Sequence, residues 1–280
     1  MPLESNGSIL ADARAHGVAV GAFNVIPLEL GEAIAAGAEA AGLPTILQIS
    51  ENTVAYHGAL GPIAAASLAL ARQAPVPVGV HLDHAATVDL VWAALDVGVP
   101  SVMFDGSTLP YAENVRRTAE VVERCHAAGA WVEAELGEVG GKDGVHAPGA
   151  RTDPRDAVAF VEATGVDALA VAVGSSHAMQ TRDAVLDFGL IADLRAALPV
   201  PLVLHGSSGV SDDGLRHAVR AGISKVNIAT HLNGVFTAMV RRQLEDATSS
   251  DPRRYLAPAR DATAAEVARL LGVLRLRDGR

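Results

Sequence analysis

The segment GLPTILQIS (residues 42–50) and its counterpart LPVPLVLHG (residues 198–206) decide the fold. Each holds a short, almost continuously apolar run that ends in polar residues, which is typical of a parallel strand buried on both faces. Similar runs recur along the chain, and each is followed by a longer Ala- and Leu-rich helical pattern. The eight predicted strands are Val18–Val25, Thr45–Ser50, Val76–His84, Ser101–Asp105, Trp131–Leu136, Ala168–His177, Pro201–His205 and Lys225–Ala229.

Eight strand–helix units predict an α/β fold, a closed (β/α)8 TIM barrel in a single domain over residues 1–280. An open, doubly wound sheet would give the same alternation. The polar residues favour the barrel, because His, Asp, Ser and Asn gather at the C-terminal ends of several predicted strands, where barrel enzymes build their sites. Two segments depart from the pattern: a Gly-rich stretch over 137–153, long enough for a lid, and a helical tail over about 247–280.

Composition limits the classes of partner. Half of the 280 residues are apolar, which is enough to fill a large core, and the formal net charge is −10. With no basic cluster, nucleic acid and anionic membranes are not expected as partners. The N-terminus lacks a signal-peptide pattern, no apolar run reaches the roughly 18 residues of a membrane span, and Cys125 has no second cysteine to pair with. We therefore expect a cytoplasmic protein.

Three histidines follow predicted strand ends: His84 in GVHLDHAA, His177 in VAVGSSHA and His205 in LVLHGSSG. One such histidine alone would more often be an ordinary core or loop residue. Three of them at one barrel mouth match catalytic zinc, which takes three protein ligands and keeps a fourth position open. His81 is predicted to lie in the barrel interior. Asp83 and His84 can both reach the mouth only if their strand ends or bends between them.

A second pattern suits an anionic group. Gly206-Ser207-Ser208-Gly209 predicts a tight turn before a helix that Ser211 would cap, and backbone N–H groups at such a place bind phosphate. An ordinary βα turn is the alternative. The chain has only two lysines, Lys142 and Lys225, and neither is expected to be a buried Schiff-base residue.

Further motifs along the chain are GAFNV, SVMFDGS, VEAELGEVGG, KVNIAT and LAPARDA. Together with the motifs above, and in the same order over nearly the whole chain, they resemble the class II (zinc-dependent) fructose-bisphosphate/tagatose-bisphosphate aldolases. The resemblance implies reversible cleavage of a ketose (bis)phosphate, such as fructose or tagatose 1,6-bisphosphate, to dihydroxyacetone phosphate and an aldehyde through a Zn-stabilised enediolate. It implies that Asp83 is a general acid/base. Metal ligands would be His84, His177 and His205, with Asp105 and Glu135 as an alternative metal position.

The resemblance also implies which residues contact the substrate. For Asn24 and Ser50, which lie at two strand ends, the alternative role is a structural cap. For Arg260 in the tail, the alternative is a surface salt bridge. A monovalent cation, Na⁺ or K⁺, and a homo-oligomer, dimer or tetramer, are further expectations. The implied contacts to substrate and phosphate are Asn24, Ser50, Ala178, Gly206, Ser207, Ser208, Asn227, Ile228, Ala229, Thr230 and Arg260.

The chain departs from the family pattern at three places. Asp143 stands where many members have the Glu that removes the carbon-bound proton, so Asp143 is the predicted base and Glu138 the alternative. Ala178 and Ser207 replace glycines, which could alter backbone approach or substrate. A zinc-dependent hydrolase barrel and a non-catalytic sugar-phosphate-binding homologue are the alternative functions.

Overall fold

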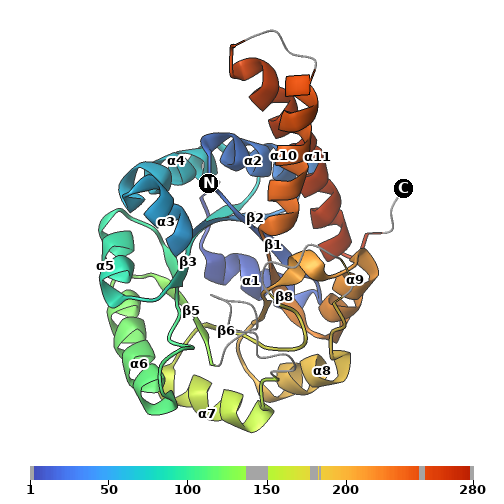
Figure 1. Ribbon diagram of the computed structural model, residues 1–280. Helices are drawn as coiled ribbons and strands as arrows, with labels where there is room; N and C mark the ends of the chain where they lie inside the picture. Colours follow the sequence, from blue (N-terminus) through green and yellow to red (C-terminus); the bar gives the residue numbers. More distant parts are fainter. Residues whose placement is uncertain (1–2, 137–150, 177–181, 183, 246–249, 278–280) are drawn as a thin grey trace.

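The computed structural model describes residues 3–136, 151–176, 182, 184–245 and 250–277. Eight parallel strands close into a barrel in the order β1 to β8, and Figure 1 shows the helices around it. The predicted TIM barrel is therefore confirmed. The strands are β1 Val20–Asn24, β2 Thr45–Ser50, β3 Val78–Ala85, β4 Ser101–Phe104, β5 Trp131–Glu135, β6 Ala168–Ala170, β7 Leu202–Leu204 and β8 Ile223–Ile228.

Most strands are followed by a helix packed on the outer face of the barrel. Capping residues set the limits of α7: Asp153 accepts a hydrogen bond from Arg155 N, Pro154 occupies the first turn, and Gly165 ends the helix at φ 70°. The helices are α1 Asn6–Ala15, α2 Leu28–Ala41, α3 Glu51–His57, α4 Leu60–Gln73, α5 Val88–Asp96, α6 Tyr111–Ala127, α7 Pro154–Thr164, α8 Phe188–Ala197, α9 Asp212–Ala221, α10 Thr230–Glu245 and α11 Arg253–Leu274, with a 3₁₀ turn η1 Ser207–Gly209.

The sixth strand is much shorter than the predicted Ala168–His177. It ends at Ala170, and although Val171 N still donates to Val203 O of β7 (3.2 Å), the backbone after Val171 bonds to loop residues. Thr152 N donates to Ala172 O (2.9 Å), and Asp187 N donates to Val173 O (2.8 Å). The continuous apolar run that begins at Ala168 is therefore buried through Val173, but only Ala168–Ala170 belongs to the sheet.

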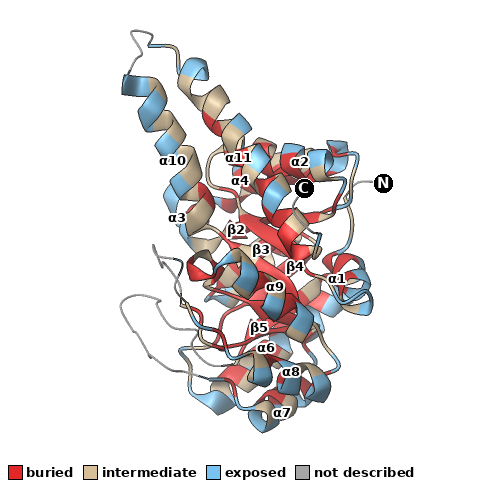
Figure 2. Cartoon of the chain, turned by 90° about the vertical axis from the view of Figure 1, so that its right-hand side faces the viewer, coloured by how far each residue is buried: buried red, intermediate tan, exposed pale blue. Residues whose placement is uncertain are grey.

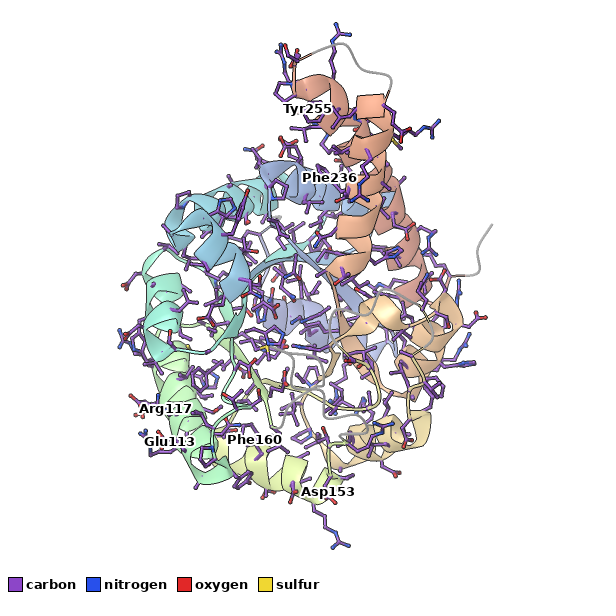
Figure 3. The ribbon with its side chains drawn as sticks, viewed as in Figure 1. Glu113, Arg117, Asp153, Phe160, Phe236 and Tyr255 are labelled. Carbon is purple, nitrogen blue, oxygen red and sulfur yellow. The ribbon has the colours of Figure 1, made fainter. Side chains whose placement is uncertain are left out.

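The tail forms a two-helix projection with α10. Its inner part is held by α2, where Gly37 lets α11 approach so closely that an added Cβ would lie 2.5 Å from Ala264 O. Figure 2 shows α10 and α11 extending past the barrel, with largely exposed or half-buried surfaces, and Figure 3 places Phe236 and Tyr255 on this projection. In the described part of the tail, α11 begins at Arg253 and ends at Leu274.

Within the described ranges, no single helix is long and apolar enough to cross a membrane. The α3 and α4 helices satisfy the length and composition test only as a pair, bent by 116°.

Candidate metal and substrate site

A cavity of about 960 Å³ opens at the C-terminal ends of the strands, the end of the barrel where the polar residues were predicted to gather. Its wall combines residues from β1, β2, β3, β8 and the loops after β4 and β7. The predicted site residues that line it are Asn24, Ser50, Asp83, His84, Asp105, Gly206, Ser207, Ser208, Asn227, Ala229 and Thr230.

The backbone of β3 turns at His84, which has φ 53°. The pairing of β3 with β4 also shifts register between Leu82 and Ala85. Regular alternation would send Asp83 and His84 to opposite faces, but this left-handed residue brings both side chains into the cavity wall. The predicted bend between them is confirmed.

His84 and His205 face each other, with 3.0 Å between His84 Nε2 and His205 Nδ1. The other nitrogen of each ring contacts a carboxylate: His84 Nδ1 donates to Asp105 Oδ2 (2.7 Å), and His205 Nε2 donates to Glu133 Oε1 (3.0 Å). An ionised carboxylate only accepts, so in the neutral rings the two facing nitrogens carry electron pairs. Two such pairs repel each other unless a cation lies between them.

A divalent metal satisfies this requirement. Two nitrogens bound tetrahedrally to Zn²⁺ lie about 3.3 Å apart, close to the separation of these rings. Asp83, the predicted acid/base, lies beside this pair: with His84 and His205 it forms one group whose candidate ligand atoms lie within 4.8 Å of one another. His84, Asp105 and Glu135 form a second such group. Each of these two groups could hold a metal ion, and the predicted third ligand of the principal position, His177, lies outside the described residues.

Beneath the mouth lies a layer of charged residues that the sequence reading missed. Glu133 and Lys225 are fully buried, and Lys225 Nζ lies 2.6 Å from Glu133 Oε2. The eighth strand was predicted to begin at Lys225, but β8 begins two residues earlier, at Ile223, so Lys225 lies within the strand. Lys225 is still a poor Schiff-base candidate, because its amino group is paired with a carboxylate and does not line the cavity.

His81 lies in this interior layer, as predicted. Its Nδ1 is 2.7 Å from Ser101 Oγ, and its Nε2 is 3.7 Å from Glu133 Oε2. Burial, together with the nearby charge of Lys225, holds the pKa of His81 well below its ordinary value. His81 is therefore neutral and lies outside the cavity wall.

The turn after β7, which was predicted to bind phosphate, requires glycine at its first residue. Gly206 adopts φ 64°, and a Cβ there would lie 2.5 Å from the carbonyl carbon of Ser176, so only glycine fits. The Ser207 hydroxyl donates to Asn227 O, and Ser208 Oγ accepts from His231 N (3.3 Å). These bonds tie the turn to the end of β8 and to the first turn of α10.

Three other predicted contacts have structural partners. Ser50 accepts from Thr53 N (3.2 Å) and so caps α3, while it also lines the cavity. Asn24 Oδ1 accepts from the Gln48 amide (3.2 Å). Arg260 does not line the cavity: it lies on α11, where it pairs with Glu32 and Asp261, as in the salt-bridge alternative.

Several predicted residues lie outside the described residues. They include the third histidine, His177, with its neighbour Ala178, and both candidates for the carbon base, Asp143 and Glu138. Three more are described but are buried and do not line the cavity: His205 and Glu135 are fully buried, and Ile228 is 2% exposed at the end of β8.

The cavity also has a wall that the sequence reading did not include. Helix α3 starts directly after β2 with no loop, so its residues face the site. Glu51 Oε2 accepts from Ala86 N (2.8 Å) and joins this helix to the end of β3. The unpredicted residues of the wall are Ile26, Glu51, Asn52, Thr53, Ala55, Tyr56, Ala86, Thr108 and Asn233.

Comparisons with known proteins agree with this geometry. The chain is 32% identical to the YdjI aldolase from Escherichia coli K12, over 99% of this chain and 100% of that one, with a TM-score of 0.86. It is 30% identical to a Coccidioides immitis protein provisionally assigned as a fructose-1,6-bisphosphate aldolase, covering 95% and 94% of the chains, with a TM-score of 0.86. The Campylobacter jejuni fructose-bisphosphate aldolase shares the fold, at 22% identity, 97% and 95% coverage and a TM-score of 0.80.

A family model supplies the remaining evidence. The model for "Fructose-bisphosphate aldolase class-II" matches residues 4–278, which is nearly the whole chain. This match includes every strand of the barrel and every described residue of the cavity wall. The protein belongs to the class II fructose-bisphosphate aldolase family.

Proposed function

We propose that this protein is a Zn²⁺-dependent aldolase that reversibly cleaves a ketose (bis)phosphate, such as fructose or tagatose 1,6-bisphosphate, to dihydroxyacetone phosphate and an aldehyde. The observation that carries the proposal is the pair of facing nitrogens on His84 and His205, each ring held by a carboxylate, with His84 and Asp83 in the wall of a large cavity. Membership of the class II family gives the reaction class.

Metal ligands would be His84 Nε2 and His205 Nδ1, with His177 as the predicted third ligand. Asp105 and Glu135 are the candidates for the alternative position. When bound, the divalent ion supplies Lewis-acid polarisation of the ketose carbonyl.

Asp83 is suited to the proton transfer that carbon–carbon cleavage requires. In the cleavage direction, a base takes the proton of the hydroxyl group on one of the two carbons of the breaking bond, and this carbon becomes the aldehyde. The Asp83 carboxylate lines the cavity, and Asn227 Nδ2 donates to its Oδ1 (3.3 Å), which fixes its direction. In synthesis the same carboxyl group returns the proton.

The electron pair of the broken bond remains on dihydroxyacetone phosphate as an enediolate, which must take up a proton at carbon. Asp143 is the predicted donor of this proton in cleavage and the base that removes it in synthesis. Glu138 remains the alternative.

Phosphate would bind at the turn Gly206–Ser208 and at the start of α10, where Thr230 opens the helix. Backbone N–H groups at a helix start favour anions, which suits a protein with a net charge of −10 and few lysines. Within the described part of the chain, the buried Asn227 Oδ1 has no hydrogen-bond partner, so it can accept from a substrate hydroxyl.

Removal of metal tests this proposal. A panel of fructose, tagatose and deoxyketose phosphates should show one or more substrates whose cleavage falls at least about 10²-fold after chelation, because loss of a Lewis acid costs several kcal/mol. Addition of Zn²⁺ should restore the rate. Full cleavage by metal-free protein would contradict the proposal, as would a loss that Zn²⁺ fails to restore.

Three expectations accompany the proposal. The buried Cys125, whose pKa is raised to about 11 by desolvation, fits a reducing compartment such as the cytoplasm. A homo-oligomer remains a prediction. The monovalent cation also remains a prediction, because Ala178, beside which it would bind, lies outside the described residues.

A further inference from the structure

We propose that Glu133, held in place by Lys225, is a positioning residue that fixes the ring orientation and tautomer of His205 for metal binding. This inference rests on the proposed function. It assigns a role to two buried charged residues that do not line the cavity.

The contacts form a chain from the barrel interior to the mouth. Glu133 accepts from His205 Nε2 at Oε1 (3.0 Å) and from Lys225 Nζ at Oε2 (2.6 Å). All three side chains are fully buried. The positions of Glu133 and Lys225 follow from the alternation of side chains along a strand. Glu133 lies two residues before Glu135 on β5, and Lys225 lies two residues before Asn227 on β8, so both point to the same face as these residues, one layer below the mouth.

Glu133 decides which nitrogen of His205 carries the proton. A carboxylate only accepts, so the proton lies on Nε2 and the electron pair of Nδ1 points to His84 Nε2. The Asn227 amide, 3.1 Å from the same Nε2, would favour the opposite tautomer. The charge-assisted bond to Glu133 is the stronger of the two, and Asn227 Nδ2 also has Asp83 Oδ1 as a partner.

Lys225 makes this arrangement possible. A carboxylate in the dry barrel interior is costly unless an opposite charge accompanies it. The third neighbour, His81, lies farther from this carboxylate: its Nε2 is 3.7 Å from Glu133 Oε2, whereas Lys225 Nζ is 2.6 Å away. Partners that orient a ligating histidine in this way typically contribute 10- to 100-fold to metal affinity.

Two double variants isolate the hydrogen bond. Glu133→Leu/Lys225→Met removes both charges together, which a core tolerates better than the loss of one partner. Glu133→Gln/Lys225→Met removes the same charges but keeps an amide oxygen that can accept from His205 Nε2. Ser101→Ala is the matched control, because Ser101 is equally buried and contacts only the neutral His81 among these residues.

The readouts are Zn²⁺ affinity by chelator competition, the visible spectrum of the Co²⁺-loaded protein, and the imidazole ¹⁵N shifts of His205 in metal-free protein. We expect the Leu/Met variant to bind Zn²⁺ about 10- to 100-fold more weakly, with an altered Co²⁺ spectrum and loss of the Nε2–H tautomer. The Gln/Met variant should recover most of the affinity, and Ser101→Ala should match the wild type. Thermal melting of all variants checks that they fold.

The outcomes separate the inference from the proposed function. If wild-type protein binds Zn²⁺ and the Leu/Met variant binds it equally well, only the positioning role is overturned. Equal losses in both double variants would also overturn it, because the acceptor oxygen would then be irrelevant. Wild-type protein that binds no divalent ion overturns the proposed function and this inference together.

Discussion

Replacement of His84 by alanine should lower kcat/KM for aldol cleavage by about 10³-fold or more and should reduce the Zn²⁺ content of the purified protein. The variant loses one of the two facing nitrogens and leaves Asp105 without its imidazole partner. Loss of Lewis-acid stabilisation of several kcal/mol corresponds to this fall in rate.

A suitable control for His84→Ala is His126→Ala. His126 also pairs with a carboxylate, Asp167 at 2.9 Å, but its side chain is 44% exposed and does not line the cavity. Steady-state kinetics and metal analysis of both variants test the assignment. His84→Ala protein with wild-type metal content and a rate within tenfold of wild type would remove His84 from the site.

Replacement of Asp83 by asparagine should lower kcat by about 10² to 10⁴-fold while the bound metal is retained. Asparagine has nearly the same size as aspartate but cannot take up the hydroxyl proton. Because the imidazoles and their carboxylate partners are unchanged, KM should change much less than kcat. Kinetics on the metal-saturated variant give both values.

Asp89→Asn is the control for charge, since Asp89 is an exposed residue in the first turn of α5. It should leave kcat unchanged. A kcat for Asp83→Asn within threefold of wild type would show that another group transfers this proton.

The fold could be predicted from the sequence because its signal is local and repeated. Apolar runs such as that over Thr45–Ser50 match a strand residue for residue. The predicted end of the sixth strand was wrong. Ala172 and Val173 have side chains typical of strands, but their carbonyl groups accept from Thr152 and Asp187, which only the folded chain brings near. A strand depends on its neighbours as much as on its own sequence.

The site was predictable where geometry constrained it. The need for both Asp83 and His84 at one mouth implied the bend at φ 53°. The Glu133–Lys225 pair was missed because its partners are 92 residues apart and meet only when the barrel closes. The sequence did hold one signal: side chains alternate between the two faces of a strand, so WVEAE (residues 131–135) places Glu133 on the same face as Glu135. The cavity wall from α3 was missed because the helix follows β2 without a loop.

The central claim is that this metal site and its neighbouring carboxylates make and use the enediolate of dihydroxyacetone phosphate. The most direct test is to incubate the Zn²⁺-loaded protein with dihydroxyacetone phosphate alone in deuterated water and to follow the carbon-bound protons by NMR. We predict that one proton on the hydroxyl-bearing carbon exchanges for deuterium, and that a chelator stops the exchange. A zinc hydrolase has no reason to catalyse it. Absence of exchange in protein shown to contain Zn²⁺ would contradict the account.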